Sequence, residues 1–136
     1  MKRMIFVNLP VADLDKAKAF YTALGFAINP QFSDETAASI VISEEIHVML
    51  LTHQKFLNFV PTGRGICDTG TQLEVLTALS CSDRGEVDSL VDKALAAGGT
   101  SFSEPQDHGF MYQRSFQDPD GHVWELVWMD MSAFAA

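Results

Sequence analysis

Apolar and polar residues alternate along the first half of the chain with the periods of strands and of one helix. Residues 4–11 are apolar and β-branched enough for a buried strand. Asp13 offers an N-cap for a helix over 14–24, and Gly25 stands where a left-handed C-terminal cap is expected. Three further strands are predicted, at 26–32, 36–43 and 46–52. The first half is therefore predicted to be a βαβββ module.

The second half repeats this order. A shift of seventy residues aligns Phe6 with Leu76 and Asp13 with Asp83, so that strand and N-cap recur together. Apolar residues then recur at helical spacing until Gly98. Three more strands are predicted, at 100–103, 110–117 and 122–129. The repeat predicts an α+β fold of two βαβββ modules.

Turn-forming residues mark the boundaries between these elements. The segment Asp118-Pro119-Asp120-Gly121 has Pro where a type I turn favours it and Gly for a positive φ, which predicts a hairpin. Residues 54–72 contain a short helical stretch at 54–60 and a Gly-rich stretch, as expected of a linker. We expect one domain over 1–136, with module one at about 1–53, the linker at 54–72 and module two at about 73–130.

Composition narrows the class of protein. With 136 residues, 47% of them hydrophobic, the chain can form one compact core. No stretch reaches the roughly 20 apolar residues of a membrane span, and the start does not resemble a signal peptide, so a cytoplasmic protein without membrane contact is expected. A net charge of −9 disfavours a nucleic acid partner. Cys67 and Cys81 are expected to be reduced thiols.

Two motifs carry a resemblance to a known family. The first half contains V-x-D-L at 11–14, F-Y at 20–21 and L-G-F at 24–26, and the second half contains D-P-D-G-x-x-W-E-L at 118–126. Over nearly its whole length the chain resembles the vicinal-oxygen-chelate superfamily of glyoxalases, bleomycin resistance proteins and extradiol dioxygenases, and within it a group of predicted lactoylglutathione lyases. The resemblance implies that each module is shaped as a curved half-barrel. It also implies a cavity for a small organic molecule and a homodimer.

The resemblance also implies four positions for the ligands of a divalent metal ion. These positions are occupied by Phe6, Leu50, Leu76 and Glu125. Only Glu125 has a donor atom, and hydrocarbon side chains have no lone pair for a metal. We therefore expect no metal and no other cofactor. A register shifted by one residue near Leu50 would instead offer His47 or His53.

Glu125 and Asn8 are the first candidate functional residues. Glu125 lies in a half-buried predicted strand, where it is a candidate general base or hydrogen-bond acceptor for a ligand. Its alternative is a rim carboxylate that is solvated or paired with Arg114. Asn8 shares a strand face with Phe6 and would present its amide to the same cavity. Its alternative is a polar group satisfied within the sheet.

A second group of candidates lies around the loop at 104–109. His108, Tyr112 and Arg114 could orient a carboxylate or phenolic ligand. The alternative is an outward-facing, salt-bridged strand surface, and it is favoured for Arg114. His122 follows the predicted hairpin turn and is expected to be solvated.

Three functions follow from these residues and the resemblance. The first is binding of a small, partly apolar molecule without a metal, with Phe6, Leu50 and Leu76 among the apolar walls. The second is a lyase or isomerase similar to lactoylglutathione lyase, in which Glu125 moves a proton. The third, an extradiol dioxygenase, requires a facial triad of iron or manganese ligands that the chain lacks at these positions. Hydrolysis by a serine nucleophile is disfavoured because no G-x-S-x-G motif is present.

Overall fold

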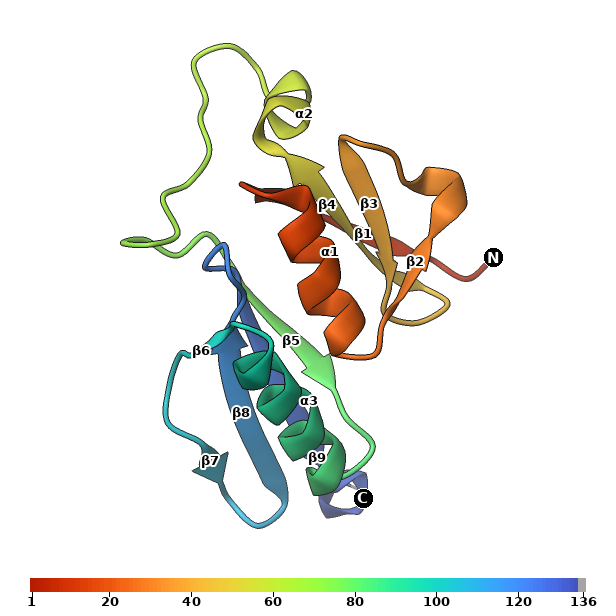
Figure 1. Cartoon of the computed structure of the whole chain (residues 1–136). Helices are drawn as coiled ribbons and strands as arrows, with labels where there is room; N and C mark the ends of the chain where they lie inside the picture. The colour runs from red at the N-terminus through yellow and green to blue at the C-terminus, as the bar shows by residue number, and fades with distance from the viewer. Residues whose placement is uncertain (135–136) are drawn as a thin grey trace. The chain divides into compact units, whose positions relative to one another are not determined.

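The chain forms two compact units that repeat one architecture. The computed structural model describes residues 1–134, in which unit 1 spans Met1–Gln72 and unit 2 begins at Leu73. Each unit contains a mixed sheet that does not close on itself, with one long helix packed against it (Figure 1). The fold is therefore α+β, as the sequence predicts.

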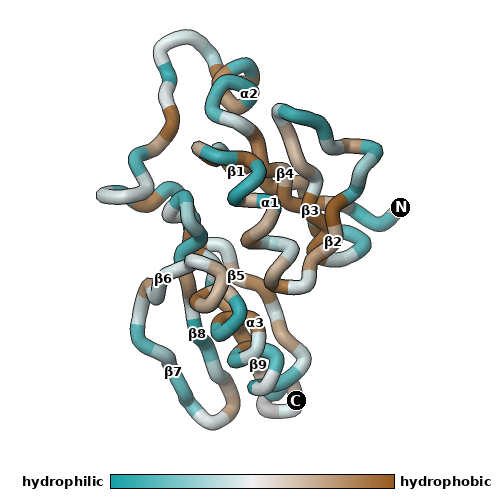
Figure 2. Tube along the Cα trace, viewed as in Figure 1, coloured by the Kyte–Doolittle hydropathy of each residue, from teal (hydrophilic) through white to brown (hydrophobic). Residues whose placement is uncertain are grey.

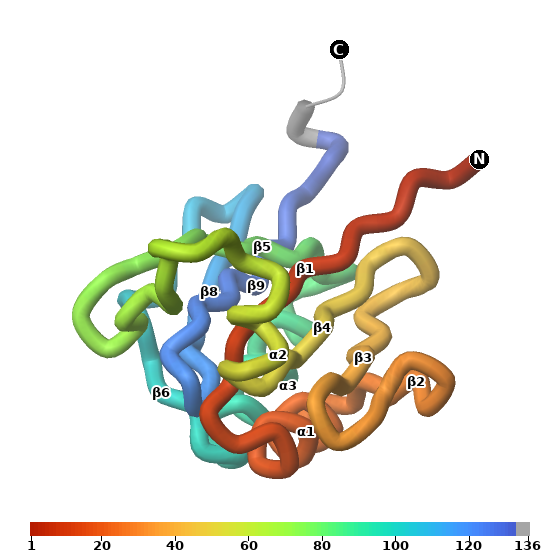
Figure 3. The backbone as a smooth tube through the Cα atoms, turned by 90° about the horizontal axis from the view of Figure 1, so that it is seen from above, coloured from red at the N-terminus to blue at the C-terminus, as the bar shows by residue number. Residues whose placement is uncertain are grey.

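Unit 1 follows the predicted βαβββ order. It consists of β1 (Ile5–Val11), α1 (Leu14–Ala23), β2 (Ala27–Asn29), the 3-10 turn η1 (Pro30–Phe32), β3 (Ala37–Val41), β4 (Ile46–Thr52) and α2 (His53–Asn58). The strands lie in the order β1-β4-β3-β2, in which β1 and β4 are parallel and the other neighbours are antiparallel. In Figure 3 these strands follow one another in that order, with α1 along one side of them.

Unit 2 repeats the arrangement in its own sheet. It consists of β5 (Leu76–Ser80), α3 (Arg84–Ala96), β6 (Thr100–Ser101), β7 (Gln106–Asp107), β8 (Met111–Gln117), β9 (Val123–Met129) and the 3-10 turn η2 (Met131–Phe134). The strand order is β5-β9-β8-β6, with β5 and β9 parallel, and β7 pairs with β8. The internal repeat predicted from the sequence is thus present in strand order and direction.

The two long helices begin directly after the predicted N-caps and end shortly before the predicted glycines, with α1 one residue shorter than expected. The side chains of Asp13 and Asp83 cap α1 and α3 by accepting from the backbone N–H three residues later, at 3.1 and 2.7 Å. Gly25 and Gly98 follow the helix ends with φ of +101° and +108°, which favours glycine because it has no Cβ. Both helices therefore begin at corresponding positions, after the first strand of their unit.

A separate apolar core lies under the long helix of each unit. The most deeply buried large side chains of unit 1 come from α1 and from the central strands, namely Phe20, Tyr21, Ile40, Val48 and Leu50. Those of unit 2 come from α3, β8 and β9, namely Val87, Val91, Phe116, Trp124 and Leu126. Figure 2 shows the hydrophobic colouring along β3 and β4, whereas the segment with β7 is hydrophilic.

Three predicted elements differ from the structure. The strand expected at 26–32 is limited to β2, because Pro30 begins a 3-10 turn. The loop at 104–109 contains the two-residue strand β7. The helical stretch of the predicted linker is α2, which begins directly at the end of β4 with Thr52 as its N-cap. No helix in residues 1–134 has the length and apolar character needed to cross a membrane.

Candidate functional site

The sheet of unit 1 has a second face, opposite the core, that is partly open. Residues paired in register share a face, so Phe6 lies with His47 and Asn8 lies with Met49. We call the face of Phe6, Asn8, His47, Met49 and Leu51 the open face of unit 1. Phe6 is 53% exposed and its ring stacks on that of His47, with centroids 5.1 Å apart. The prediction that Phe6 and Asn8 share a face is confirmed.

Leu50 lies on the other face of the sheet. It pairs with Leu9 of β1 and Ala38 of β3, and it is fully buried in the core of unit 1. Its expected place beside Phe6 is therefore wrong. Because side chains alternate along a strand, His47 occupies the open face instead, as the alternative register anticipated.

A cavity opens between the open face of unit 1 and α2. Its volume is about 320 Å³, and it is lined by Asn8, Leu51, Phe56, Phe59 and Val60. The side chain of Asn8 is the polar group of the lining, and its Nδ2 donates only a long hydrogen bond of 3.4 Å to the carbonyl oxygen of Phe6. An apolar pocket with a single amide is the composition expected of a site for a small, largely apolar molecule.

The lining residues from α2 and its C-terminal end were not predicted as site residues. The sequence segment that contains Phe56, Phe59 and Val60 was assigned to a linker, because its helix is only six residues long. A usable signal was present: two phenylalanines spaced by three residues lie on one side of a helix. Such a pair in a segment thought to be a linker indicates that the segment covers an apolar surface.

The sheet of unit 2 also has a face opposite its helix. Leu76 and Glu125 both lie on it, because Leu76 pairs with Val123 and Glu125 lies two residues further along β9. The carboxylate of Glu125 accepts a hydrogen bond from Nε2 of Gln113 on β8. Leu76 is 52% exposed. Glu125 is thus a half-buried acceptor that is already engaged, and its partner is not Arg114.

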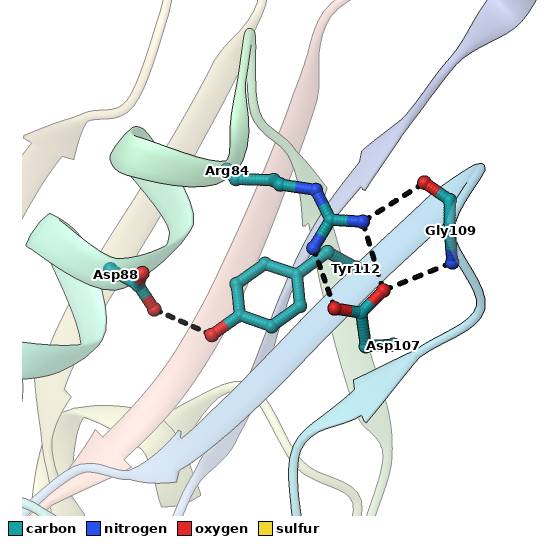
Figure 4. A network of polar contacts seen from close by, with 5 residues as sticks. All are labelled: Arg84, Asp88, Asp107, Gly109 and Tyr112. Carbon is teal, nitrogen blue, oxygen red and sulfur yellow. Dashed lines mark hydrogen bonds and ion pairs between the residues drawn. The ribbon is translucent and has the colours of Figure 1, made fainter.

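Tyr112 and Arg114 lie on the opposite face from Glu125, next to α3. The Tyr112 hydroxyl donates to Oδ1 of Asp88 at 2.7 Å (Figure 4), and Arg114 Nη1 donates to the same oxygen at 2.9 Å and to Asp92 at 3.0 Å. The hydrogen bond from Tyr112, followed by that from Arg114, lowers the pKa of Asp88. These two candidates therefore join β8 to α3, as the salt-bridge alternative for Arg114 anticipated.

Arg84 extends this polar network to the segment with β7. Its guanidinium donates twice to the carboxylate of Asp107, at 2.8 Å each, and once to the carbonyl oxygen of Gly109 at 2.9 Å (Figure 4). It also lies 5.1 Å from the ring centroids of both Tyr112 and Trp128. The hydrogen bond from Arg84 holds the pKa of Asp107 well below its usual value.

Replacing Arg84 by glutamine is expected to release the segment around β7. The variant loses the bidentate pair and the stacked guanidinium, while α3 keeps its N-cap. Amide hydrogen exchange at residues 106–112 should become several-fold faster, with little change in β9. Arg64→Gln, in the part of unit 1 that follows α2, is the matched control. Unchanged exchange at 106–112 would contradict a fastening role for Arg84.

The two remaining histidine predictions have different outcomes. His108 is exposed in the loop after β7, with Nε2 3.5 Å from Oε1 of Gln106. His122, expected to be solvated, is only 3% exposed, and that prediction is wrong. Its Nδ1 pairs with Oε1 of Glu74, and its backbone N–H donates to Oδ1 of Asp118 at 2.9 Å. The ring is buried because the tight turn at 118–121 folds it back toward the start of β5.

Cys81 is the cysteine with a clearly altered environment. Burial, followed by the nearby carboxylate of Glu86, raises the pKa of its thiol to about 12. Because the thiolate is the nucleophile, Cys81 should resist iodoacetamide in mildly alkaline buffer. A Cys67→Ser variant should therefore stay unlabelled when native and become labelled once unfolded, as mass spectrometry would show. Cys81→Ser is the matched control. Rapid native labelling at Cys81 would refute the expectation.

The positions that the resemblance assigns to metal ligands do not fit a metal ion. Phe6 and Leu76 present hydrocarbon side chains, Leu50 lies in the core, and Glu125 is the single donor. Hydrocarbon groups cannot replace metal-bound water. Among residues 1–134, no three or more His, Cys, Asp or Glu side chains gather in an arrangement that could hold a metal ion.

His47 takes the open-face position that Leu50 was expected to hold. Whether this position can bind a metal ion therefore depends on its ring nitrogens. Nε2 lies 3.0 Å from the carbonyl oxygen of Glu44. A carbonyl oxygen only accepts, so Nε2 carries the proton and Nδ1 is the ring nitrogen that keeps a lone pair. His47 therefore offers at most one donor atom to a cation. His53 begins α2 and is exposed.

Comparison with known proteins agrees with this architecture. The family described as bleomycin resistance protein-like N-terminal matches residues 3–43. A hypothetical protein from S. aureus is 32% identical, with 94% of each chain covered and a TM-score of 0.77. A glyoxalase/bleomycin resistance protein/dioxygenase family enzyme from Burkholderia phytofirmans is 20% identical, with 94% of this chain and 99% of that chain covered and a TM-score of 0.74.

A lactoylglutathione lyase from Agrobacterium tumefaciens is 18% identical, with 94% of each chain covered and a TM-score of 0.66. At such identities the Burkholderia and Agrobacterium proteins show the fold alone. No curated protein matches the chain significantly.

Two successive βαβββ units with the same strand order define an α+β protein built from two repeated modules. The matched family and the similar structures make the assignment more specific. Residues 3–43 match the bleomycin resistance protein-like N-terminal family, and the chain has the fold of the glyoxalase/bleomycin resistance/dioxygenase proteins, also called the vicinal-oxygen-chelate fold.

Proposed function

We propose that this protein binds a small, largely apolar organic molecule in the cavity of unit 1, and that it does so without a divalent metal ion. The observation that carries the proposal is the cavity of about 320 Å³ between the open face and α2. This volume lies at the lower end of the range of roughly 300–1,000 Å³ that is usual for small-molecule sites.

The lining favours binding by burial of apolar surface. Phe59 is 68% exposed, so its ring has surface that a ligand would remove from water. Burial of apolar area contributes about 25 cal/mol per Å² before the cost of association. The amide of Asn8, in the floor of the cavity, supplies one donor and one acceptor that orient the ligand.

Metal-free binding is supported by the chemistry of the residues at the superfamily's ligand positions. Phe6 and Leu76 are hydrocarbon side chains, and the carboxylate of Glu125 is hydrogen-bonded to Gln113. These positions therefore favour apolar contact over coordination. A titration with zinc, nickel or iron should therefore leave ligand affinity and thermal midpoint unchanged. A stoichiometric, high-affinity metal that contacts Glu125 would overturn this part of the proposal.

The proposal is tested by ligand binding to wild type and to cavity variants. A panel of small aromatic and branched compounds is screened by thermal shift, because a ligand that binds only the folded protein raises the midpoint by mass action. For each compound that binds, calorimetry on Phe56→Ala and Asn8→Ala should show about tenfold weaker binding or more, corresponding to about 1.4 kcal/mol. Phe110→Ala, an exposed aromatic of unit 2, is the matched control.

Two results would contradict the proposal. One is that no compound of the panel binds, or that binding is unaffected by both cavity substitutions. The other is turnover of the hemithioacetal of methylglyoxal and glutathione that is lost in Glu125→Gln, which would show a lyase with its catalytic centre in unit 2. The hydrogen bond from Gln113 to Glu125 gives that activity less support than the cavity gives to binding.

A further inference from the structure

We propose that the molecule held in this cavity is an organic anion, a small carboxylate with an aromatic or branched apolar body, and that its charge is met by Lys55. The inference rests on the proposed function, because it assigns the chemical class of the ligand for the same cavity. It is carried by the position of Lys55 on α2 and by the absence, within residues 1–134, of a carboxylate in an ion pair with it.

Lys55 is held beside the cavity by two contacts. Its backbone N–H donates to Oγ1 of Thr52 at 3.2 Å, which fixes the first turn of α2 at the end of β4. Its ammonium nitrogen lies 5.5 Å from the ring centroid of Phe59, one of the lining residues. An ammonium over an aromatic face is attracted by the ring and loses part of its freedom to move away. The positive charge therefore lies over Phe59, next to the lining residues, although Lys55 itself does not line the cavity.

This charge is not neutralised by an ion pair within residues 1–134. The ion pairs of unit 1 in that range involve Lys2 with Glu44 and Glu45. Asp34 is close enough for Lys55 to contribute to the lowering of its pKa, but the main causes are hydrogen bonds from Thr36. Oδ1 of Asp34 accepts from the backbone and hydroxyl of Thr36 and from the backbone of Ala37, at 2.7–3.0 Å. The carboxylate of Asp34 is thus engaged in the hydrogen bonds of the turn to which it belongs.

The remainder of the cavity suits the rest of such a molecule. Leu51, Phe56 and Val60 provide apolar contact for a ring or a branched chain. Nδ2 of Asn8 can exchange its long bond to Phe6 for a shorter, charge-assisted bond to a carboxylate. A cationic ligand would meet the like charge of Lys55, and a neutral one would gain nothing from it. In a chain with a net charge of −9, a local cation is what makes an anion a favourable ligand.

The test compares ligands that share a body and differ in charge. Phenylacetate, phenylacetamide and 2-phenylethylamine form one set, and isovalerate, isovaleramide and isopentylamine form a second. Binding is measured by ligand-observed NMR on the whole chain, at low and at high salt. We expect each carboxylate to bind about fivefold more tightly than its amide, the amine to bind least, and the preference to shrink as salt is added.

Variants separate the charge of Lys55 from the shape of the cavity. Lys55→Gln should remove the preference for the carboxylate and leave the affinity for the amide unchanged, whereas Lys55→Arg should keep the preference. Lys16→Gln, an exposed lysine of α1, is the control. Equal binding of acid and amide by wild type would overturn this inference and leave the proposed function standing. Binding of none of the six compounds would also overturn this inference, whereas the proposed function falls only if no compound of the wider panel binds.

Discussion

Replacing Leu50 by alanine is expected to lower the free energy of unfolding by about 2–5 kcal/mol. The side chain is fully buried between β1, β3 and the helix side of the core, so its removal costs transfer free energy and leaves a cavity that the packed strands cannot fill. Urea denaturation followed by circular dichroism measures the change, with the midpoint shifting at an unchanged slope.

Phe6→Ala is the matched comparison for this experiment. Phe6 is half exposed and stacks only on His47, so its loss should cost less than about 1 kcal/mol. From the sequence, both residues were expected to face the cavity, since both stand at metal-ligand positions of the family that the chain resembles. If both variants lost equally little free energy of unfolding, Leu50 would have to lie on the open face, and the register of β1 and β4 would be refuted.

The fold was predictable because its signals are local and occur twice. Asp13 and Asp83 are N-caps, and Gly25 and Gly98 follow the helix ends, at matching places in the two halves. Strands β4 and β9 were located by their runs of apolar residues. The length of β2 was overestimated, because the sequence pattern does not show where the strand ends. In the structure the 3-10 turn that begins at Pro30 ends it. The expected dimer stays a prediction.

The candidate site was less predictable, because a side chain's face depends on strand pairing and not on the sequence of its own strand. Phe6 and Asn8 were placed correctly, since residues two apart share a face. Leu50 was placed by its alignment with a metal ligand, and one residue of register moved it into the core. Tyr112 and Arg114 share a face as predicted, but the pairing of β8 with β9 turns that face to α3.

The cavity was missed for a different reason. Phe56 and Phe59 lie outside both βαβββ modules, in a segment that the repeat assigns to neither. Their place beside Leu51 in the lining of the cavity depends on α2 beginning directly at the end of β4, where Thr52 is its N-cap. A short helix has little sequence signal of its own, and its position follows from the surface that it covers.

A substitution of His122 should show the largest effect among the polar residues of unit 2. In His122→Ala the carboxylate of Glu74 loses its buried partner and the ring leaves a void, which should cost about 2–3 kcal/mol. The pair joins the segment before β5 to the turn before β9, and these two strands are parallel neighbours. Amide exchange in β5 should therefore become faster together with the loss of stability.

The exposed His108 gives the control for this prediction, since His108→Ala should change the free energy of unfolding by no more than about 0.5 kcal/mol. A double-mutant cycle isolates the pair itself. Because Glu74 and His122 contact each other, the double alanine variant should lose clearly less than the sum of the two single variants. Strict additivity would mean that the ring contributes by packing alone, and an effect as small as that of His108→Ala would contradict the burial of His122.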